Sequence, residues 1–176
     1  YQFSRARHYQ VLGVASVWEK RKGLEAFCQL RRILPENYDI TLVGLTNKQA
    51  RLLPDGISSV RRTDSVQELV ELYANADVFV NPSQAESFGM TTAEALSCGT
   101  PAIVYDTTAC PELVDEQTGS VVLLDDIDAL ADAVRRWCEN PQRIKTRKLC
   151  RERAVSLFSR QDRYQEYYNL YDSLLK

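Results

Sequence analysis

The chain has 176 residues, of which 44% are apolar and 26% charged, and its formal net charge is −2. This length predicts one domain that buries about 70% of its unfolded surface, and the near-neutral charge argues against a dedicated nucleic-acid binder. The sequence has no run of about 18 apolar residues, so we expect no membrane span. The N-terminus shows neither a signal core nor an initiator Met, so we expect a fragment with a linker at residues 1–9.

The cysteines are odd in number and widely spaced, which is typical of reduced thiols in a cytoplasmic protein. They are Cys28, Cys98, Cys110, Cys138 and Cys150. The chain has no Cys-x-x-Cys pair and one histidine, so the sequence predicts no metal site. The pair Asp126-x-Asp128 resembles a metal-binding motif, but it precedes a helical pattern and is interpreted as a helix cap.

The first half of the chain alternates short apolar runs with segments of helical spacing. We expect strands at residues 10–15, 39–44, 57–61 and 77–81. We expect helices at residues 22–34, 46–53 and 66–76, the first two ended by Pro35 and Pro54. Asp64 or Ser65 can cap the third helix, with Glu68 near the capping-box position.

The second half contains two more predicted strands and then becomes helical. Strands are expected at residues 102–105 and 119–123, and helices at residues 90–97, 111–115, 125–139, 141–158 and 162–175. Pro141 suits the first position of its helix. That helix is basic, and we expect a solvated face, with contact to anionic lipid as the alternative. The last helix is rich in Tyr, which indicates either a core-facing stripe or contact with a further domain.

Apolar strands that alternate with helices predict an α/β fold with a doubly wound parallel sheet. Right-handed crossovers give a Rossmann-like six-stranded order, 3-2-1-4-5-6, with extra C-terminal helices, over residues 10–176. In such a sheet, ligands bind outside the carboxyl ends of the strands, where the order reverses between strands one and four. The loop after strand one carries Ser16, Arg21 and Lys22, and the loop after strand four carries residues 86–89.

These residues suit a nucleoside diphosphate that carries a polyhydroxy group. The backbone N–H groups of residues 88–91 begin a helix and attract a phosphate, and Lys22 can neutralise a diphosphate. Glu94 can accept hydrogen bonds from vicinal hydroxyls, as acidic residues do for ribose, while Glu86 can face the group beyond the phosphates. Taken singly, Glu94 can instead favour the helix dipole, and Lys22 and Glu86 can be solvated surface residues.

Several ordered motifs resemble one known family. The run Glu86-x7-Glu94 continues into Ala-Leu-Ser-Cys-Gly-Thr-Pro-Ala-Ile-Val. It is similar to the signature of the C-terminal, donor-binding domain of retaining GT-B glycosyltransferases, the glycosyl transferases group 1 family. The resemblance extends over residues 11–122 and includes three further motifs, which are Lys22-Gly23-Leu24, the run at residues 69–83, and Pro111-Glu112-Leu113-Val114.

The resemblance implies transfer of a sugar from a UDP- or GDP-sugar to an acceptor hydroxyl, with retention of configuration and without a metal or other cofactor. It implies that Glu94 holds the ribose and that Lys22 and Glu86 are the catalytic residues, Lys22 on the diphosphate. The distal phosphate and the transferred sugar are assigned to Glu86 and the backbone of Ser87, Phe88, Gly89, Met90 and Thr91. The base is expected near residues 62–64, which include Arg62 and Thr63.

The family often has Arg where this chain has Ser16, and Gly is common where Ser87 stands. Arg21 is a candidate substitute for the missing cation. The acceptor, a glycan or a lipid-linked sugar, is expected to bind an N-terminal domain that the sequence lacks, so the fragment alone transfers nothing. We expect a cytoplasmic location, and the full protein can also contact the inner face of the membrane from that side. A nucleotide-sugar epimerase and a non-catalytic nucleotide-sugar-binding module are the alternatives.

Overall fold

A computed structural model describes residues 7–175 of the chain. Within this range six strands pair in parallel in the order β3-β2-β1-β4-β5-β6, which confirms the predicted topology. The strands are β1 (Tyr9–Val14), β2 (Tyr38–Val43), β3 (Ile57–Val60), β4 (Val78–Asn81), β5 (Ala102–Tyr105) and β6 (Gly119–Val122). Tyr9 already pairs with Tyr38, so β1 begins one residue before the strand that the sequence predicts.

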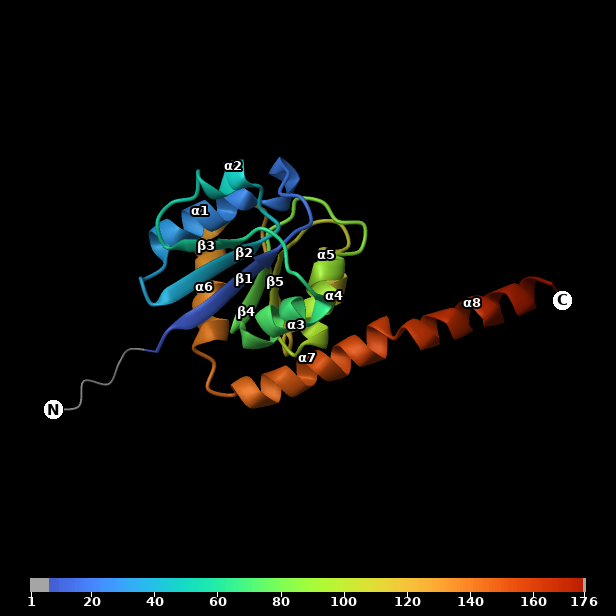
Figure 1. The fold of residues 1–176 in the computed structure, drawn as a ribbon. Helices are drawn as coiled ribbons and strands as arrows, with labels where there is room; N and C mark the ends of the chain where they lie inside the picture. The colour runs from blue at the N-terminus through green and yellow to red at the C-terminus, as the bar shows by residue number, and fades with distance from the viewer. Residues whose placement is uncertain (1–6, 176) are drawn as a thin grey trace.

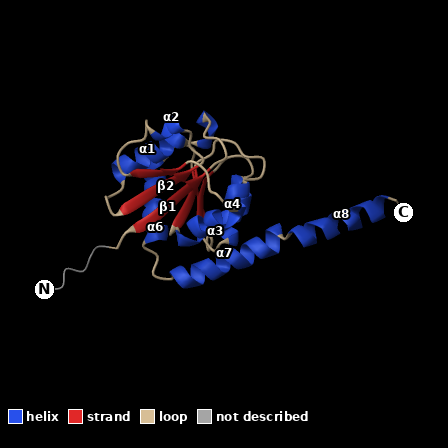
Figure 2. Ribbon diagram, in the orientation of Figure 1, coloured by secondary structure: helices blue, strands red, loops and turns tan. Residues whose placement is uncertain are grey.

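Helices cover both faces of the sheet (Figure 2). Those in the described range are α1 (Leu24–Ile33), α2 (Asn47–Ala50), α3 (Val66–Asn75), α4 (Met90–Ser97), α5 (Cys110–Leu113), α6 (Ile127–Cys138), α7 (Arg143–Phe158) and α8 (Arg160–Leu174). One apolar cluster joins α1 and α6 to one face of the sheet, and a second joins α3, α4, α5 and α7 to the other. The strands lie between the two clusters (Figure 1).

The alternation of side chains explains why the central strands are mostly apolar. In β1, Val11 faces the first cluster and Leu12 faces the second. In β4, Val78 faces the first cluster and Phe79 faces the second. A strand buried on both faces favours apolar residues on either side of the sheet. All four residues of β4 are buried, and this strand lies at the centre of the sheet beside β1.

The helix boundaries agree with the sequence to within two residues, apart from the end of the helix expected at residues 46–53. The helix expected from residue 22 begins at Leu24, because Lys20–Lys22 forms a 3-10 turn that Gly23 ends at φ 74°. The expected helix at residues 46–53 shortens to Asn47–Ala50. Pro141 is not the first helical residue, since α7 begins at Arg143 after Gln142. The cap predictions hold: Ser65 Oγ accepts from Glu68 N, and Asp126 Oδ1 from Ala129 N.

The solvated basic face that we expected on α7 is present only in part, because Lys145 and Lys148 are exposed while several arginines bind neighbouring helices. Arg147 donates to the carbonyls of Ala74 and Ala76 at the end of α3, and Arg151 donates to Ser97 O at the end of α4 at 2.8 Å. Arg153 binds the carbonyls of Glu112 and Leu113 in α5, and Arg143 pairs with buried Asp77 at 2.6 Å. Cations at helix C-termini satisfy the last carbonyls and oppose the negative end of the helix dipole. Helix α7 therefore fastens three helix ends to the domain.

The Tyr-rich helix α8 leaves the body of the domain (Figure 1). None of its described residues is buried, and Tyr164, Tyr167, Tyr168 and Tyr171 are each more than half exposed. The expectation of a core-facing stripe is therefore wrong, because the helix extends beyond the sheet that it would cover. Contact with a further domain stays a prediction. No helix among residues 7–175 combines the length and apolarity needed to cross a bilayer.

Gly44 allows the loop after β2 to approach the loop after β1. Its φ is 97°, and a Cβ there would lie 1.6 Å from the carbonyl oxygen of Ala15. Gly44→Ala is therefore expected to destabilise the domain by about 3 kcal/mol or more, measured by urea unfolding. Gly56→Ala is the matched control, because Gly56 has φ 85° but its Cβ would meet only the flexible side chain of Arg31, at 3.0 Å. A similar loss for both variants, near 1 kcal/mol, would show that backbone conformation alone matters.

Because arginines of α7 bind the ends of other helices, removing one of them is expected to lower the stability of the domain more than removing an exposed lysine of α7. Arg147→Met leaves the carbonyls of Ala74 and Ala76 without their donor, and we expect it to cost about 1–3 kcal/mol of unfolding free energy. Lys148→Met, at a side chain 77% exposed, is expected to change stability by less than about 0.5 kcal/mol. Equal midpoints in urea for the two variants would contradict the assignment.

Candidate functional site

The loops after β1 and β4 meet at the carboxyl edge of the sheet. Lys22 Nζ forms an ion pair with Glu86 Oε1, and these side chains are only 20% and 10% exposed. Two further contacts join the same loops, since Gln84 N donates to Arg21 O at 2.8 Å and the Arg21 guanidinium donates to Ala85 O at 3.1 Å. The two residues that the sequence assigned to catalysis are therefore in direct contact, although 64 positions separate them.

The loop after β5 holds the Glu86 loop from the other side. Thr107 Oγ1 donates to Ser83 O at 2.9 Å, and Thr108 Oγ1 accepts from the backbone N–H of Glu86 at 2.9 Å. Thr108 has φ 47°, which is uncommon for a β-branched residue. Sequence reasoning missed both threonines. The available signal was their place directly after a strand, since all six strand ends meet at this edge.

A cleft of about 560 Å³ lies beside these loops. Its walls come from the ends of β1 and β2, the loop after β3, and the start of α4. The lining residues include Val14, Ala15, Ser16, Val43, Gly44, Arg61, Arg62, Thr63, Leu69, Met90, Thr91 and Glu94. This volume is within the usual range for small-molecule and cofactor sites, and the location at the order reversal between β1 and β4 is the one that the topology predicts.

Helix α4 directs its N-terminus toward this edge. Gly89 precedes it with φ 90° and ψ 52°, and no side chain caps the helix start. The first intrahelical bonds are those of Thr92 N and Ala93 N to Gly89 O, which leaves the N–H groups of Met90 and Thr91 outside the helical ladder. A helix start of this kind can accept a phosphate or another anion.

Glu94 lines the cleft from the second turn of α4, which has no acidic residue in its first turn. The alternative that Glu94 merely favours the helix dipole is therefore weakened, because that effect falls off beyond the first turn. The buried hydroxyl of Tyr73 donates to Glu94 Oε2 at 3.0 Å. Burial, with the neighbouring Glu94 carboxylate as a smaller cause, raises the pKa of Tyr73 well above its usual value, so the hydroxyl stays protonated.

The structure brings six of the twelve expected site residues into the cleft: Ser16, Arg62, Thr63, Met90, Thr91 and Glu94. Lys22 and Glu86 form the adjoining ion pair, and exposed Ser87 and buried Gly89 connect that pair to α4. Arg61 joins the lining without having been expected. The roles of these residues in binding stay predictions.

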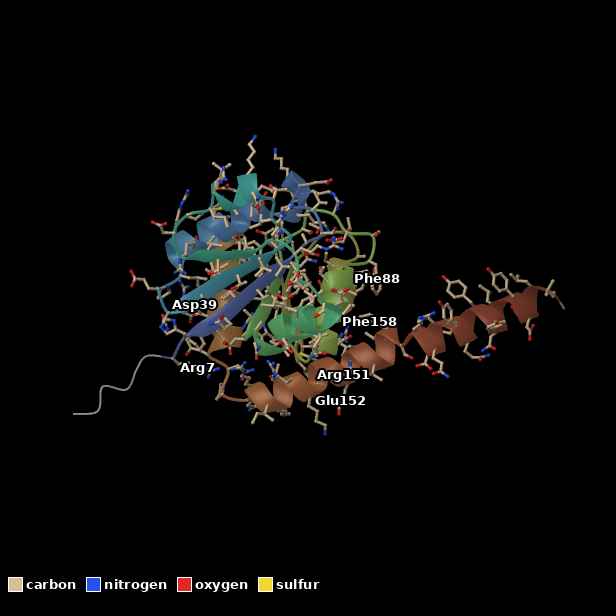
Figure 3. All side chains as sticks on the ribbon, in the orientation of Figure 1. Arg7, Asp39, Phe88, Arg151, Glu152 and Phe158 are labelled. Carbon is tan, nitrogen blue, oxygen red and sulfur yellow. The ribbon has the colours of Figure 1, made fainter. Side chains whose placement is uncertain are left out.

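Two expected residues lie elsewhere. Arg21 does not take the place of a cation at Ser16, because its guanidinium is engaged with Glu19 at 3.1 Å and with Ala85 O. Phe88 packs edge-on against Phe158 with ring centroids 5.5 Å apart (Figure 3). Its side chain lines an adjoining apolar groove of about 490 Å³ between α3, α4 and the end of α7, which shares Leu69, Met90 and Glu94 with the cleft, so only the Phe88 backbone could serve the cleft.

Comparisons with known proteins agree on one family. The profile described as "Glycosyl transferases group 1" matches residues 8–140. The chain is 32% identical over 168 residues to the MMP alpha-(1->4)-mannosyltransferase of Mycolicibacterium hassiacum, a match that covers 85% of this chain and 39% of that protein. It is 37% identical over 88 residues to a GDP-mannose-dependent alpha-(1-6)-phosphatidylinositol dimannoside mannosyltransferase of Mycobacterium tuberculosis, covering 50% of this chain and 22% of that protein.

Solved structures share the fold. Sucrose-phosphate synthase of Thermosynechococcus elongatus superposes with a TM-score of 0.80 at 28% identity, covering 95% of this chain and 46% of that one. HepE of Anabaena superposes with a TM-score of 0.81 at 22% identity, covering 96% and 50%. The chain thus spans half or less of the length of these relatives. The chain belongs to the glycosyl transferases group 1 family.

Proposed function

We propose that this chain is the donor-binding half of a retaining glycosyltransferase, which transfers a hexose from a nucleoside-diphosphate sugar to an acceptor hydroxyl. The observation that carries the proposal is the convergence of Lys22, Glu86, Glu94 and the start of α4 at the carboxyl ends of β1 and β4. Two relatives support it, since one is named as GDP-mannose-dependent and HepE was solved with UDP and with UDP-glucose.

Within the proposal, each part of the donor has a partner in the structure. The N–H groups at the start of α4 and Lys22 receive the diphosphate, and no metal ion is required because these groups supply the positive potential. Glu94 receives the ribose hydroxyls, and the loop after β3, with Arg61 and Arg62, borders the base. Ser16 brings no charge, so Lys22 carries more of the diphosphate binding than in relatives that have Arg there.

The proposed reaction breaks the bond between the anomeric carbon and the phosphate oxygen and forms a bond to the acceptor oxygen on the same face of the sugar. The acceptor proton passes to the departing phosphate. Glu86 pairs with Lys22 and contacts the hydroxyls of the transferred sugar. The acceptor, a glycan or a lipid-linked sugar of polysaccharide biosynthesis, binds the remainder of the protein, in the cytoplasm or at the inner face of the membrane. This chain alone transfers nothing.

The proposal predicts nucleotide binding by this chain. Calorimetric titration with UDP, GDP and ADP is expected to show saturable binding of one of them, which names the base. Glu94→Ala is expected to weaken that binding by tenfold or more, because two charge-assisted hydrogen bonds are lost. Binding is expected to be the same with and without EDTA.

The matched control is Glu116→Ala, which removes the same charge from an exposed residue that precedes β6 at the opposite edge of the sheet. It is expected to bind like the unaltered chain. Failure of all three nucleotides to bind at millimolar concentration, or equal losses in both variants, would contradict the assigned donor site.

The reaction class predicts a stereochemical outcome for the full-length protein. NMR of the product is expected to show the anomeric configuration of the donor, and Glu86→Gln is expected to lower kcat by about a hundredfold with a smaller effect on nucleotide affinity. Inversion at the anomeric carbon would refute the retaining mechanism. Release of a rearranged free sugar without acceptor would indicate the epimerase alternative instead.

A further inference from the structure

Tyr73 is held rigidly beneath the cleft by groups other than Glu94. It belongs to the last turns of α3 and is 1% exposed. Its ring packs edge-on against Phe79 of β4 with centroids 5.5 Å apart. Its backbone carbonyl accepts a hydrogen bond from Thr100 Oγ1 at 2.6 Å. The direction of its hydroxyl is therefore fixed by the core of the domain, independently of any ligand.

The hydroxyl has one partner within the described residues, which is Glu94. It donates to Oε2 at 3.0 Å, and no group among residues 7–175 donates to Oε1. A glutamate side chain has three rotatable bonds, and in an open cleft it would otherwise populate several rotamers. The contact thus orders one oxygen of the carboxylate and leaves the other available at the cleft that Glu94 lines.

We propose that Tyr73 is a positioning residue that fixes the Glu94 carboxylate and thereby makes the site selective for nucleotides with an intact ribose diol. The inference rests on the proposed function and adds to it, since Tyr73 touches no substrate. An ordered carboxylate presents two acceptor positions to the 2′- and 3′-hydroxyls without first losing rotamer freedom. An analogue without these hydroxyls gains nothing from that order.

The test compares two ligands on two forms of the chain. The ligands are UDP or GDP, whichever binds the unaltered chain more tightly, and its 2′,3′-dideoxy analogue. Tyr73→Phe removes only the hydroxyl, and we expect it to weaken binding of the ribonucleotide by about three- to tenfold while binding of the dideoxy analogue stays within twofold of the unaltered chain. The measured quantity is the dissociation constant of the dideoxy analogue divided by that of the ribonucleotide. Tyr73→Phe is expected to lower this ratio, which a merely structural role of Tyr73 would not change.

The matched control is Tyr38→Phe. Tyr38 is 2% exposed, and its hydroxyl donates to Glu139 Oε1 at 2.6 Å, but it lies at the first position of β2, at the opposite edge of the sheet. The variant loses the same type of Tyr–Glu hydrogen bond, and its ratio is expected to equal that of the unaltered chain. Thermal unfolding of both variants shows whether each is folded.

A second variant keeps the test decisive if Tyr73→Phe does not fold. Glu94→Asp keeps the charge but withdraws the carboxylate from the Tyr73 hydroxyl, and it is expected to lower the same ratio. Equal weakening of both ligands, or an unchanged ratio in the variant that folds, overturns the role of Tyr73 while nucleotide binding itself stands. If the unaltered chain binds neither ligand, the proposed function fails and the inference fails with it.

Discussion

The ion pair between Lys22 and Glu86 connects the two halves of the sheet at the point where the strand order reverses. From β1 the chain proceeds toward β2 and β3, and from β4 toward β5 and β6, so the two loops lead apart. Both partners are largely shielded from water, where an attraction between opposite charges is stronger than at the surface. Removing either partner leaves the other charge partly desolvated, so the geometry of the site depends on both.

Hydrogen bonds from neighbouring residues also hold Glu86 and Glu94 in place. Thr108 holds the backbone of Glu86, and Tyr73 holds the carboxylate of Glu94, each from a different strand connection or helix. The Glu86 backbone is thus held by a neighbouring loop, and the Glu94 carboxylate by a tyrosine buried in the core. Such support is what keeps a binding site close to its productive geometry before the ligand arrives.

Local patterns explain the success of the sequence predictions. Runs such as residues 78–80 are apolar because they are covered on both faces, and the strand order followed from right-handed crossovers. The start of α4 at Met90 and the caps at Ser65 and Asp126 depend on neighbouring residues only, and all were found. The position predicted for Pro141 was wrong, because α7 begins two residues later, at Arg143, with Gln142 as its N-cap. Several neighbouring residues could have started this helix, so the local sequence did not fix its first residue.

The sequence by itself determined the fold class, the sheet order and the edge at which the site lies, because these depend on periodicity and chain connectivity. Only the tertiary structure decided the partners of individual side chains. Three arginines of α7 bind the ends of three helices, Arg21 is engaged away from the cleft, and Tyr73 supports Glu94. These partners lie between 21 and 73 positions apart, and a side chain's choice among distant groups is fixed only when packing brings one of them within hydrogen-bond reach.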